Sequence, residues 1–79
     1  MEMTAFSFDR QPGKPLYERL YQQIKNRIVS GELAVGEKLP SKLRLAAFLG
    51  VGKNTVETAY EQLMVEGYIE SMPKRGYFV

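Results

Sequence analysis

The chain has 79 residues, of which 25% are charged, and it carries a formal net charge of +2 without a single cysteine or histidine. A chain of this length forms one small domain with at most a shallow pocket, and the missing residue types exclude thiol and imidazole catalysis and nearly all structural zinc or haem sites. We therefore do not expect an enzyme. Because neither an apolar run long enough to cross a membrane nor a signal peptide is present, we predict a cytoplasmic protein.

Residues 1–15 predict an N-terminal arm, since Pro12, Gly13 and Pro15 punctuate a segment without periodicity. The arm has no core of its own. A single domain is predicted for residues 16–79.

The first element of that domain is an amphipathic helix. From Leu16 to Ile28 apolar residues recur every three or four positions while polar residues fill the other side, and Ser30 and Gly31 end the pattern. The tyrosines at helical spacing are predicted to be core residues rather than base-stacking platforms: Tyr17, Tyr21 and Tyr60.

Two short elements are expected next. A few residues of edge strand are predicted around Leu33 to Val35, in a segment that Gly36 and Pro40 make irregular. Ser41 is a natural N-cap, so the sequence predicts a second helix over residues 42–49.

A third helix and a hairpin complete the domain. Gly50 ends the second helix, and the period restarts to predict a helix over residues 53–66, with Gly67 as its stop. The final stretch, YIESMPKRGYFV, indicates strand, turn and strand, with residues 73–76 in the turn. The fold class is thus mainly α with a small β-hairpin.

The stretch GVGKNT, residues 50–55, has the composition of backbones that hold phosphate. A nucleotide-binding loop of the Walker type needs glycine where Ala47 stands and a hydroxyl where Asn54 stands. A dinucleotide loop fails at Thr55 and lacks a preceding strand. A bound nucleotide is therefore poorly supported.

The same stretch fits the turn of a helix-turn-helix. Ala46 is small enough for two helices to approach, Gly50 follows four positions on to enter a left-handed turn, and Val56 anchors the next helix. Gly52 then takes the N-cap of a helix whose N-terminus attracts anions. The phosphate is accordingly predicted to be that of a DNA backbone.

Charge is unevenly distributed along the chain. Residues 38–56 carry four basic residues and no acid, residues 71–79 carry Lys74 and Arg75 without an acid, and the glutamates between these blocks have no basic partner in the sequence: Glu57, Glu61, Glu66 and Glu70. Two basic blocks of this kind suit an anionic polymer, with ordinary solvated surface as the alternative.

Three stretches together resemble the DNA-binding domain of the GntR family of bacterial transcription regulators: PLYERLYQQIKNRIVSGELAVGEKLPS, LAAFLGVGKNTVETAYEQL, and EGYI with RGYFV. The resemblance covers nearly the whole chain from about Pro15. Within the family, the opening FSFDR with KPLY and the run NTVETAYEQL are most similar to MocR-type members, whose second domain is similar to a pyridoxal-phosphate aminotransferase and senses an effector.

This resemblance implies a winged helix-turn-helix that recognises double-stranded operator DNA. Residues 53–66 would form the recognition helix in the major groove, and residues 72–77 would form a wing near the minor groove. The full-length protein would be a homodimer and this fragment a monomer. No cofactor is expected here, although a missing C-terminal domain would hold pyridoxal phosphate.

The chain departs from the family pattern at two places. Gly52 and Lys53 stand where the family usually has Ser-Arg, which exchanges a planar fork for a point charge. Leu43 stands where the family has an arginine three positions after Pro40, and Arg44 lies about 100° further around the helix.

The residues expected at the DNA interface come from the second helix, the third helix and the wing: Ser41, Lys42, Arg44, Lys53, Asn54, Thr55, Thr58, Lys74, Arg75 and Gly76. Among these residues, Lys53 is the principal expected DNA contact. Asn54 would pair with adenine or cap the helix, and the threonines would meet phosphate or a thymine methyl, unless Thr55 only satisfies the first turn. Lys42 and Arg44 would touch phosphate or lie on solvated surface. Glu57 would accept from cytosine or face away.

Two other functions stay open. A winged-helix module that binds protein without specific DNA contact would not place Lys42, Lys53 and Arg75 on a common surface. A nucleotide switch or enzyme is a more distant alternative.

Overall fold

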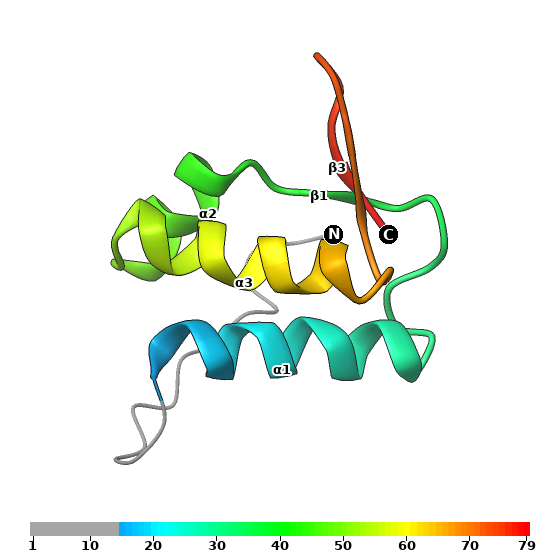
Figure 1. Cartoon of the computed structure of the whole chain (residues 1–79), viewed down its shortest axis with the longest axis horizontal. Coiled ribbons are helices and arrows are strands. Elements are labelled where there is room, and N and C mark those ends of the chain that lie inside the picture. The colour runs from blue at the N-terminus through cyan, green and yellow to red at the C-terminus, as the bar shows by residue number, and fades with distance from the viewer. Residues whose placement is uncertain (1–14) are drawn as a thin grey trace.

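The computed structural model describes residues 15–79, which form three helices and three short strands. In chain order these are α1 (Leu16–Val29), β1 (Lys38–Leu39), α2 (Lys42–Leu49), α3 (Lys53–Val65), β2 (Glu70–Met72) and β3 (Gly76–Phe78). The helices α1 and α3 lie side by side, α2 packs near the start of α3, and the strands lie at its other end (Figure 1). The predicted N-terminal arm lies outside the described residues, apart from Pro15.

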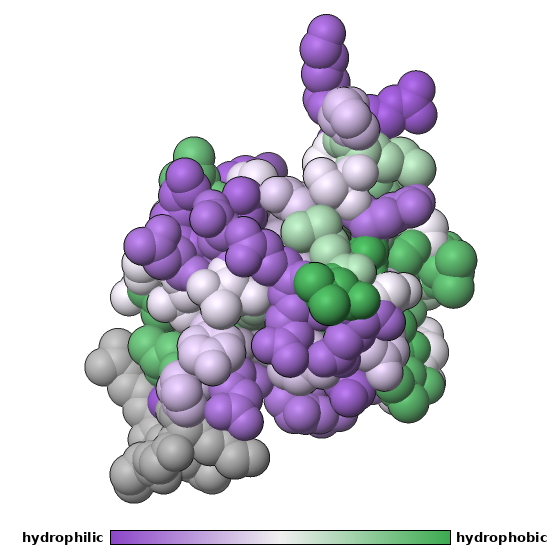
Figure 2. Space-filling view, in the orientation of Figure 1, coloured by the Kyte–Doolittle hydropathy of each residue, from purple (hydrophilic) through white to green (hydrophobic). Residues whose placement is uncertain are grey.

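A hairpin of β2 and β3 projects from the body of the molecule, and the space-filling view shows hydrophilic residues gathered at its tip (Figure 2). Both strand pairings are antiparallel, and the strand order is β1-β3-β2, with Leu39 opposite Tyr77 and Ser71 opposite the same Tyr77. The expected hairpin is confirmed, and β1 extends it to a three-stranded sheet.

The edge strand predicted around Leu33 to Val35 is wrong. That segment enters a turn in which the Glu37 N–H donates to the Ala34 carbonyl at 3.0 Å, and Gly36 has φ 87. The strand instead forms directly after Glu37, at Lys38 and Leu39, where β3 is its pairing partner. Leu33 is buried nonetheless, as a loop residue that closes the core.

The core is built around α3. Val56, Ala59, Tyr60 and Leu63 are fully buried and recur at the three- and four-residue spacing of one helix face. Burying an aliphatic or aromatic side chain of this size stabilises the fold by about 1.5–3 kcal/mol each. The other buried residues come from the elements packed around α3: Leu20, Tyr21, Ile24, Leu33, Leu39, Leu45, Ala46 and Ile69.

The predicted core tyrosines divide. Tyr60 and Tyr21 are buried, as expected, but Tyr17 is exposed, so its predicted core position is wrong. Tyr17 shares the apolar face of α1 with Leu20 and Ile24, but it lies in the first turn of the helix. The periodicity of the sequence shows which face of a helix is apolar, and it does not show how far along the helix that face is covered.

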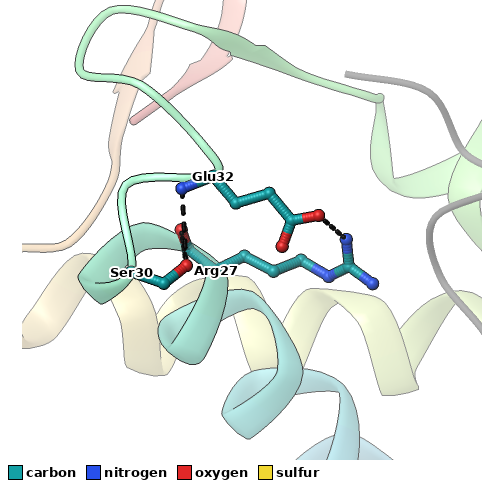
Figure 3. A network of polar contacts seen from close by, with 3 residues as sticks. All are labelled: Arg27, Ser30 and Glu32. Atoms are coloured by element: carbon teal, nitrogen blue, oxygen red, sulfur yellow. Dashed lines mark hydrogen bonds and ion pairs between the residues drawn. The ribbon is translucent and has the colours of Figure 1, made fainter.

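A polar network closes the C-terminal end of α1 (Figure 3). Ser30 donates its hydroxyl to the Arg27 carbonyl at 3.1 Å and accepts from the Glu32 N–H at 3.4 Å, while the Arg27 guanidinium pairs with the Glu32 carboxylate at 3.1 Å. The Ser30 hydroxyl thus bonds a carbonyl that a helix end leaves free, and the left-handed Gly31, with φ 84, turns the chain away just after the predicted Ser30.

The turn between α2 and α3 has the predicted geometry. Ser41 caps α2 by accepting from the Arg44 N–H at 3.2 Å. At the other end Gly50 is left-handed, with φ 69 and ψ 33. The Val51 N–H reaches back to the Ala46 carbonyl at 3.0 Å, which is the hydrogen bond of a Schellman motif.

Candidate nucleic-acid interface

The first turn of α3 is exposed and has no side-chain cap. Gly52 occupies the N-cap with φ −69 and ψ 150. Within residues 15–79, the N–H groups of Lys53 and Asn54 have no acceptor, whereas that of Thr55 donates to the Gly52 carbonyl at 3.1 Å. Free N–H groups and the positive end of the helix dipole favour an anion at this position.

Two further predicted residues lie along the solvent side of α3. Asn54 and Thr58 are both exposed and are four positions apart, so they follow one another on the same face of the helix. Thr55 is half-buried, between this face and the core. Asn54 and Thr58 therefore share the solvent face of α3, and Lys53 is exposed at the first residue of the helix.

The start of α2 carries the next group of predicted residues. The Ser41 hydroxyl is already an acceptor in the cap of its own helix. Arg44 is exposed and makes no ion pair within residues 15–79. Leu43 is 65% exposed, so it is not a packing residue.

Lys42 is engaged with neighbouring elements. Its ammonium lies 3.1 Å from the Glu57 carboxylate of α3 and 5.8 Å from the centre of the Tyr77 ring of β3. The hydrogen bond from Lys42 holds the pKa of Glu57 below its usual value, and the same bond raises the pKa of Lys42. The prediction that Lys42 meets phosphate thus has a competitor in the protein itself.

The expectation that the central glutamates have no basic partner is wrong for Glu57. Lys42 engages one oxygen of the Glu57 carboxylate, and the expected alternatives, a contact with cytosine or a position facing away from DNA, stay predictions. Glu66 is also occupied, since it accepts from the Tyr21 hydroxyl and from the Gln62 amide. The Lys42–Glu57 and Tyr21–Glu66 contacts join residues far apart in the chain, so local charge patterns did not connect them. The Gln62–Glu66 contact is local, because the two residues are four positions apart.

The tip of the wing, the hairpin of β2 and β3, carries the last predicted group. Lys74 and Arg75 are exposed, and neither makes an ion pair within the described part of the chain. Lys74 has φ 64, and the Arg75 N–H donates to the Met72 carbonyl at 3.0 Å. Gly76 is half-buried, begins β3 with φ 113, and lies opposite Met72.

The predicted residues fall into two separate groups. One occupies the starts of α2 and α3, and the other occupies the wing tip. In Figure 1, α2 and the wing both lie on the side of α3 away from α1, at opposite ends of that helix. Sequence reasoning did not identify Tyr77, which touches Lys42 between the two groups, because no local pattern marks a contact between residues so far apart in the chain.

Residues 15–79 hold no group of three or more acidic, cysteine or histidine side chains placed to bind a metal ion. None of the described helices has the length and apolar character needed to cross a membrane.

Three helices, a left-handed turn before the third, and a projecting antiparallel hairpin define the winged helix-turn-helix class of DNA-binding domains. The chain belongs to the GntR family, because the family described as "Bacterial regulatory proteins, gntR family" matches residues 16–79. It carries the DNA-binding domain of that family of transcription regulators, as the sequence predicts.

Two relatives illustrate this membership. The uncharacterised HTH-type transcriptional regulator YhdI of Bacillus subtilis is 46% identical over 78 residues, which are 99% of this chain and 16% of the relative. The probable rhizopine catabolism regulatory protein MocR of Rhizobium meliloti is 38% identical over 71 residues, which are 90% of this chain and 14% of that protein. The chain thus spans about one sixth of the length of these relatives or less.

Solved structures agree with the fold. YtrA from Sulfolobus acidocaldarius, a GntR-family transcription factor, superposes with a TM-score of 0.85 at 41% identity over 95% of this chain and 79% of its own. The AraR DNA-binding domain in complex with operator ORX1 superposes with a TM-score of 0.79 at 25% identity over 91% of this chain and 92% of its own.

Proposed function

We propose that this domain binds double-stranded operator DNA, with α3 in the major groove and the wing beside the minor groove. The observation that carries the proposal is the uncapped, exposed start of α3, where Lys53 and Asn54 present a side-chain cation and free N–H groups together. Phosphate suits such a helix end. The operator complex of the similar AraR domain supports the same use of the fold.

The charge distribution fits this orientation. Lys53, Arg44, Lys74 and Arg75 are exposed and make no ion pair within residues 15–79. The Lys42 ammonium offsets the charge of the Glu57 carboxylate on α3. The domain therefore has cations available for phosphate at both the recognition helix and the wing.

Base recognition would come from the exposed side of α3. Asn54 has the amide that pairs with the N6 and N7 atoms of adenine, and Thr58, four residues on, has a methyl group and a hydroxyl that suit thymine or phosphate. Ser41 lies at the start of α2 and Thr55 in the first turn of α3, where they would approach the DNA backbone. Gly76 would bring the wing strand close to the duplex.

The test is a titration of the domain against duplex DNA at several salt concentrations. With about four phosphate contacts, log affinity should fall against log salt with a slope of about −3 to −4. Lys53→Ala should reduce that slope by about 1. Lys25→Ala removes the same charge from α1, where the ammonium lies over Tyr21 and Tyr68, and it should leave the slope unchanged.

A slope near zero for the wild-type domain would contradict DNA binding and favour the rival, a winged-helix module that binds protein. Equal effects of Lys53→Ala and Lys25→Ala would contradict the placement of α3 against the duplex. Either result is separable from misfolding by the helical signal in circular dichroism, which both variants should retain.

For the complete regulator we propose a cytoplasmic homodimer whose further domain supplies most of the dimer contacts and binds pyridoxal phosphate. The similarity to MocR and the small share of its relatives that the chain spans support this. The domain described here would bind DNA without a cofactor and without catalysis. The residues after Val79 in the gene test the idea, because an aminotransferase needs a lysine for the Schiff base.

A further inference from the structure

Lys42, Glu57, Tyr60 and Tyr77 form a junction between the helix-turn-helix and the wing. Lys42 is the first residue of α2, and its ammonium touches α3 through Glu57 at 3.1 Å and β3 through the Tyr77 ring at 5.8 Å. An ammonium within about 6 Å of an aromatic centroid is attracted by the face of the ring. One side chain thus contacts all the elements that carry the proposed DNA-binding groups.

The junction continues into the core. The rings of Tyr77 and Tyr60 meet edge to face, with centroids 4.9 Å apart. The buried Tyr60 hydroxyl donates to the Pro40 carbonyl at 2.8 Å, between β1 and α2. Leu39 of β1 also pairs with Tyr77 of β3. The contacts of Tyr77 and Tyr60 therefore connect β3 to the segment directly before α2.

We propose that Lys42 is a positioning residue that holds the wing in a fixed orientation relative to α3, and not a phosphate contact. The inference rests on the proposed function, since it assigns a role within DNA binding. An ammonium that left the junction to reach phosphate would abandon both Glu57 and Tyr77, and it would expose the Glu57 carboxylate beside the DNA backbone. Like charges at such a site oppose binding.

Fixing the wing matters because the proposed contacts lie in two separate groups. When one group is bound, a rigid connection raises the effective concentration of the other, and a loose connection lowers it. The β2–β3 hairpin has only three residues in each strand, and all the β2 residues are exposed. Its orientation therefore depends strongly on β3, where Tyr77 meets Lys42.

The experiment compares DNA binding by Lys42→Met, Lys42→Arg, and the double variant Lys42→Met with Glu57→Gln. Methionine keeps the length of the stem over Tyr77 without the charge, and the double variant replaces the ion pair with two uncharged groups. In the double variant we expect affinity to fall by roughly three- to tenfold while the salt slope stays at the wild-type value. Lys42→Arg should retain near wild-type affinity, because it preserves the pair.

A second measurement tests whether the effect acts through the wing. Lys42→Met is combined with Lys74→Ala and Arg75→Ala, which remove the charges of the wing tip. If Lys42 acts by positioning the wing, adding Lys42→Met to the wing-tip variant should leave its DNA affinity nearly unchanged, because a wing that makes no DNA contacts gains nothing from a fixed orientation. A phosphate contact at Lys42 would instead add its full effect.

Two results together support the inference: an unchanged salt slope in the double variant, and loss of the Lys42→Met effect when the wing tip lacks charge. A slope reduced by about 1 in the double variant, full additivity with the wing-tip variant, or wild-type affinity of Lys42→Met would each overturn it. Lys53→Ala in parallel reports on the proposed function, since its slope falls in either case when the domain binds DNA through α3.

Discussion

Lys74 at the wing tip adopts a backbone conformation that a lysine does not favour. Its φ of 64 follows Pro73, and the turn is closed by the bond from the Arg75 N–H to the Met72 carbonyl at 3.0 Å. Such a turn, with proline first and a positive φ next, ordinarily takes glycine or asparagine. Retaining a cation there has a cost in stability, and the projecting tip gives that cation an outward position.

Lys74→Gly should therefore separate stability from binding. Relief of the left-handed strain should raise the free energy of unfolding by about 0.5–1 kcal/mol. The loss of charge should weaken DNA binding, with a salt slope reduced by about 1. Chemical denaturation and DNA titration measure the two quantities. In Arg75→Gly, whose φ is not positive, binding should weaken without the gain in stability; a gain there would contradict the strain at Lys74.

Tyr60 combines full burial with a hydrogen bond to the Pro40 carbonyl at 2.8 Å. Burial raises the pKa of its hydroxyl, because the phenolate would lose its hydration. Because the pKa of Tyr60 is higher in the folded chain than in the unfolded chain, the protonated hydroxyl contributes to stability at pH values below the unfolded pKa of about 10. That contribution is lost as the pH rises above 10, since the unfolded chain then releases a proton that the folded chain retains.

Tyr60→Phe should destabilise the domain by about 0.5–1.5 kcal/mol at neutral pH, because the hydrogen bond is lost. It should also lose less stability than the wild type between about pH 10 and 12, because phenylalanine has no proton for the unfolded chain to release. Urea denaturation across this pH range measures both effects. Tyr17→Phe, at an exposed ring, is the matched control and should change neither. Parallel pH profiles for wild type and Tyr60→Phe would contradict the account.

At the scale of the elements, two glycines of the helix-turn-helix have different roles despite their proximity. Gly50 is left-handed, with φ 69, whereas Gly52 has φ −69 and open space where a side chain would lie. Only the first position requires glycine for its backbone. The second is an N-cap, at which serine is preferred.

Gly52→Ser should raise the stability of the domain by a few tenths of a kcal/mol, while Gly52→Val should lower it by about 1 kcal/mol or more, because valine cannot cap. Gly50→Ser, the same substitution two residues earlier, should cost about 1–2 kcal/mol through left-handed strain. Thermal unfolding of the three variants gives the comparison. If Gly52→Ser destabilised the domain as much as Gly50→Ser, the assignment of the cap would be wrong.

The elements differ in how far the sequence predicts them. The helices carry their own signals, such as the period from Leu16 to Ile28 and the Ser41 cap, and the structure confirms each of them. The β1 strand has two residues, too few for any alternation, and it exists only because β3 pairs with it. Tertiary pairing, absent from local patterns, explains the misplaced strand at Leu33 to Val35.

In the candidate site, too, local patterns predict some features, and contacts between distant residues decide others. Exposure of Asn54 and Thr58 follows from helix periodicity, because the opposite face holds the buried residues, whereas Lys53 is exposed as the first residue of α3. The pair of Lys42 and Glu57 joins residues fifteen positions apart on different helices, so charge counting along the chain left Glu57 without a partner. Which cations remain available for DNA is thus decided by the fold.

At the scale of the whole molecule, the exposed apolar side chains are spread over separate elements. The large ones lie on the three helices, on β2 and in the loop before β1: Tyr17, Val29, Val35, Leu43, Phe48, Val65 and Met72. A stable interface buries about 800 Å² per partner around a well-packed apolar centre. Single residues on several elements do not make such a centre, and isolated apolar residues are ordinary on protein surfaces.

The isolated domain should therefore be a monomer of 9.0 kDa in solution. Sedimentation velocity at micromolar concentration should give one species of that mass, unchanged by tenfold dilution. A dimer that persists on dilution would contradict the prediction. Val35→Glu then locates its interface, because Val35 is 94% exposed in a loop that borders an apolar groove with Ile28, Tyr68 and Val79. A charge there would dissociate a dimer formed through that groove, since an unpaired buried carboxylate is costly, whereas a dimer formed through α2 would survive it.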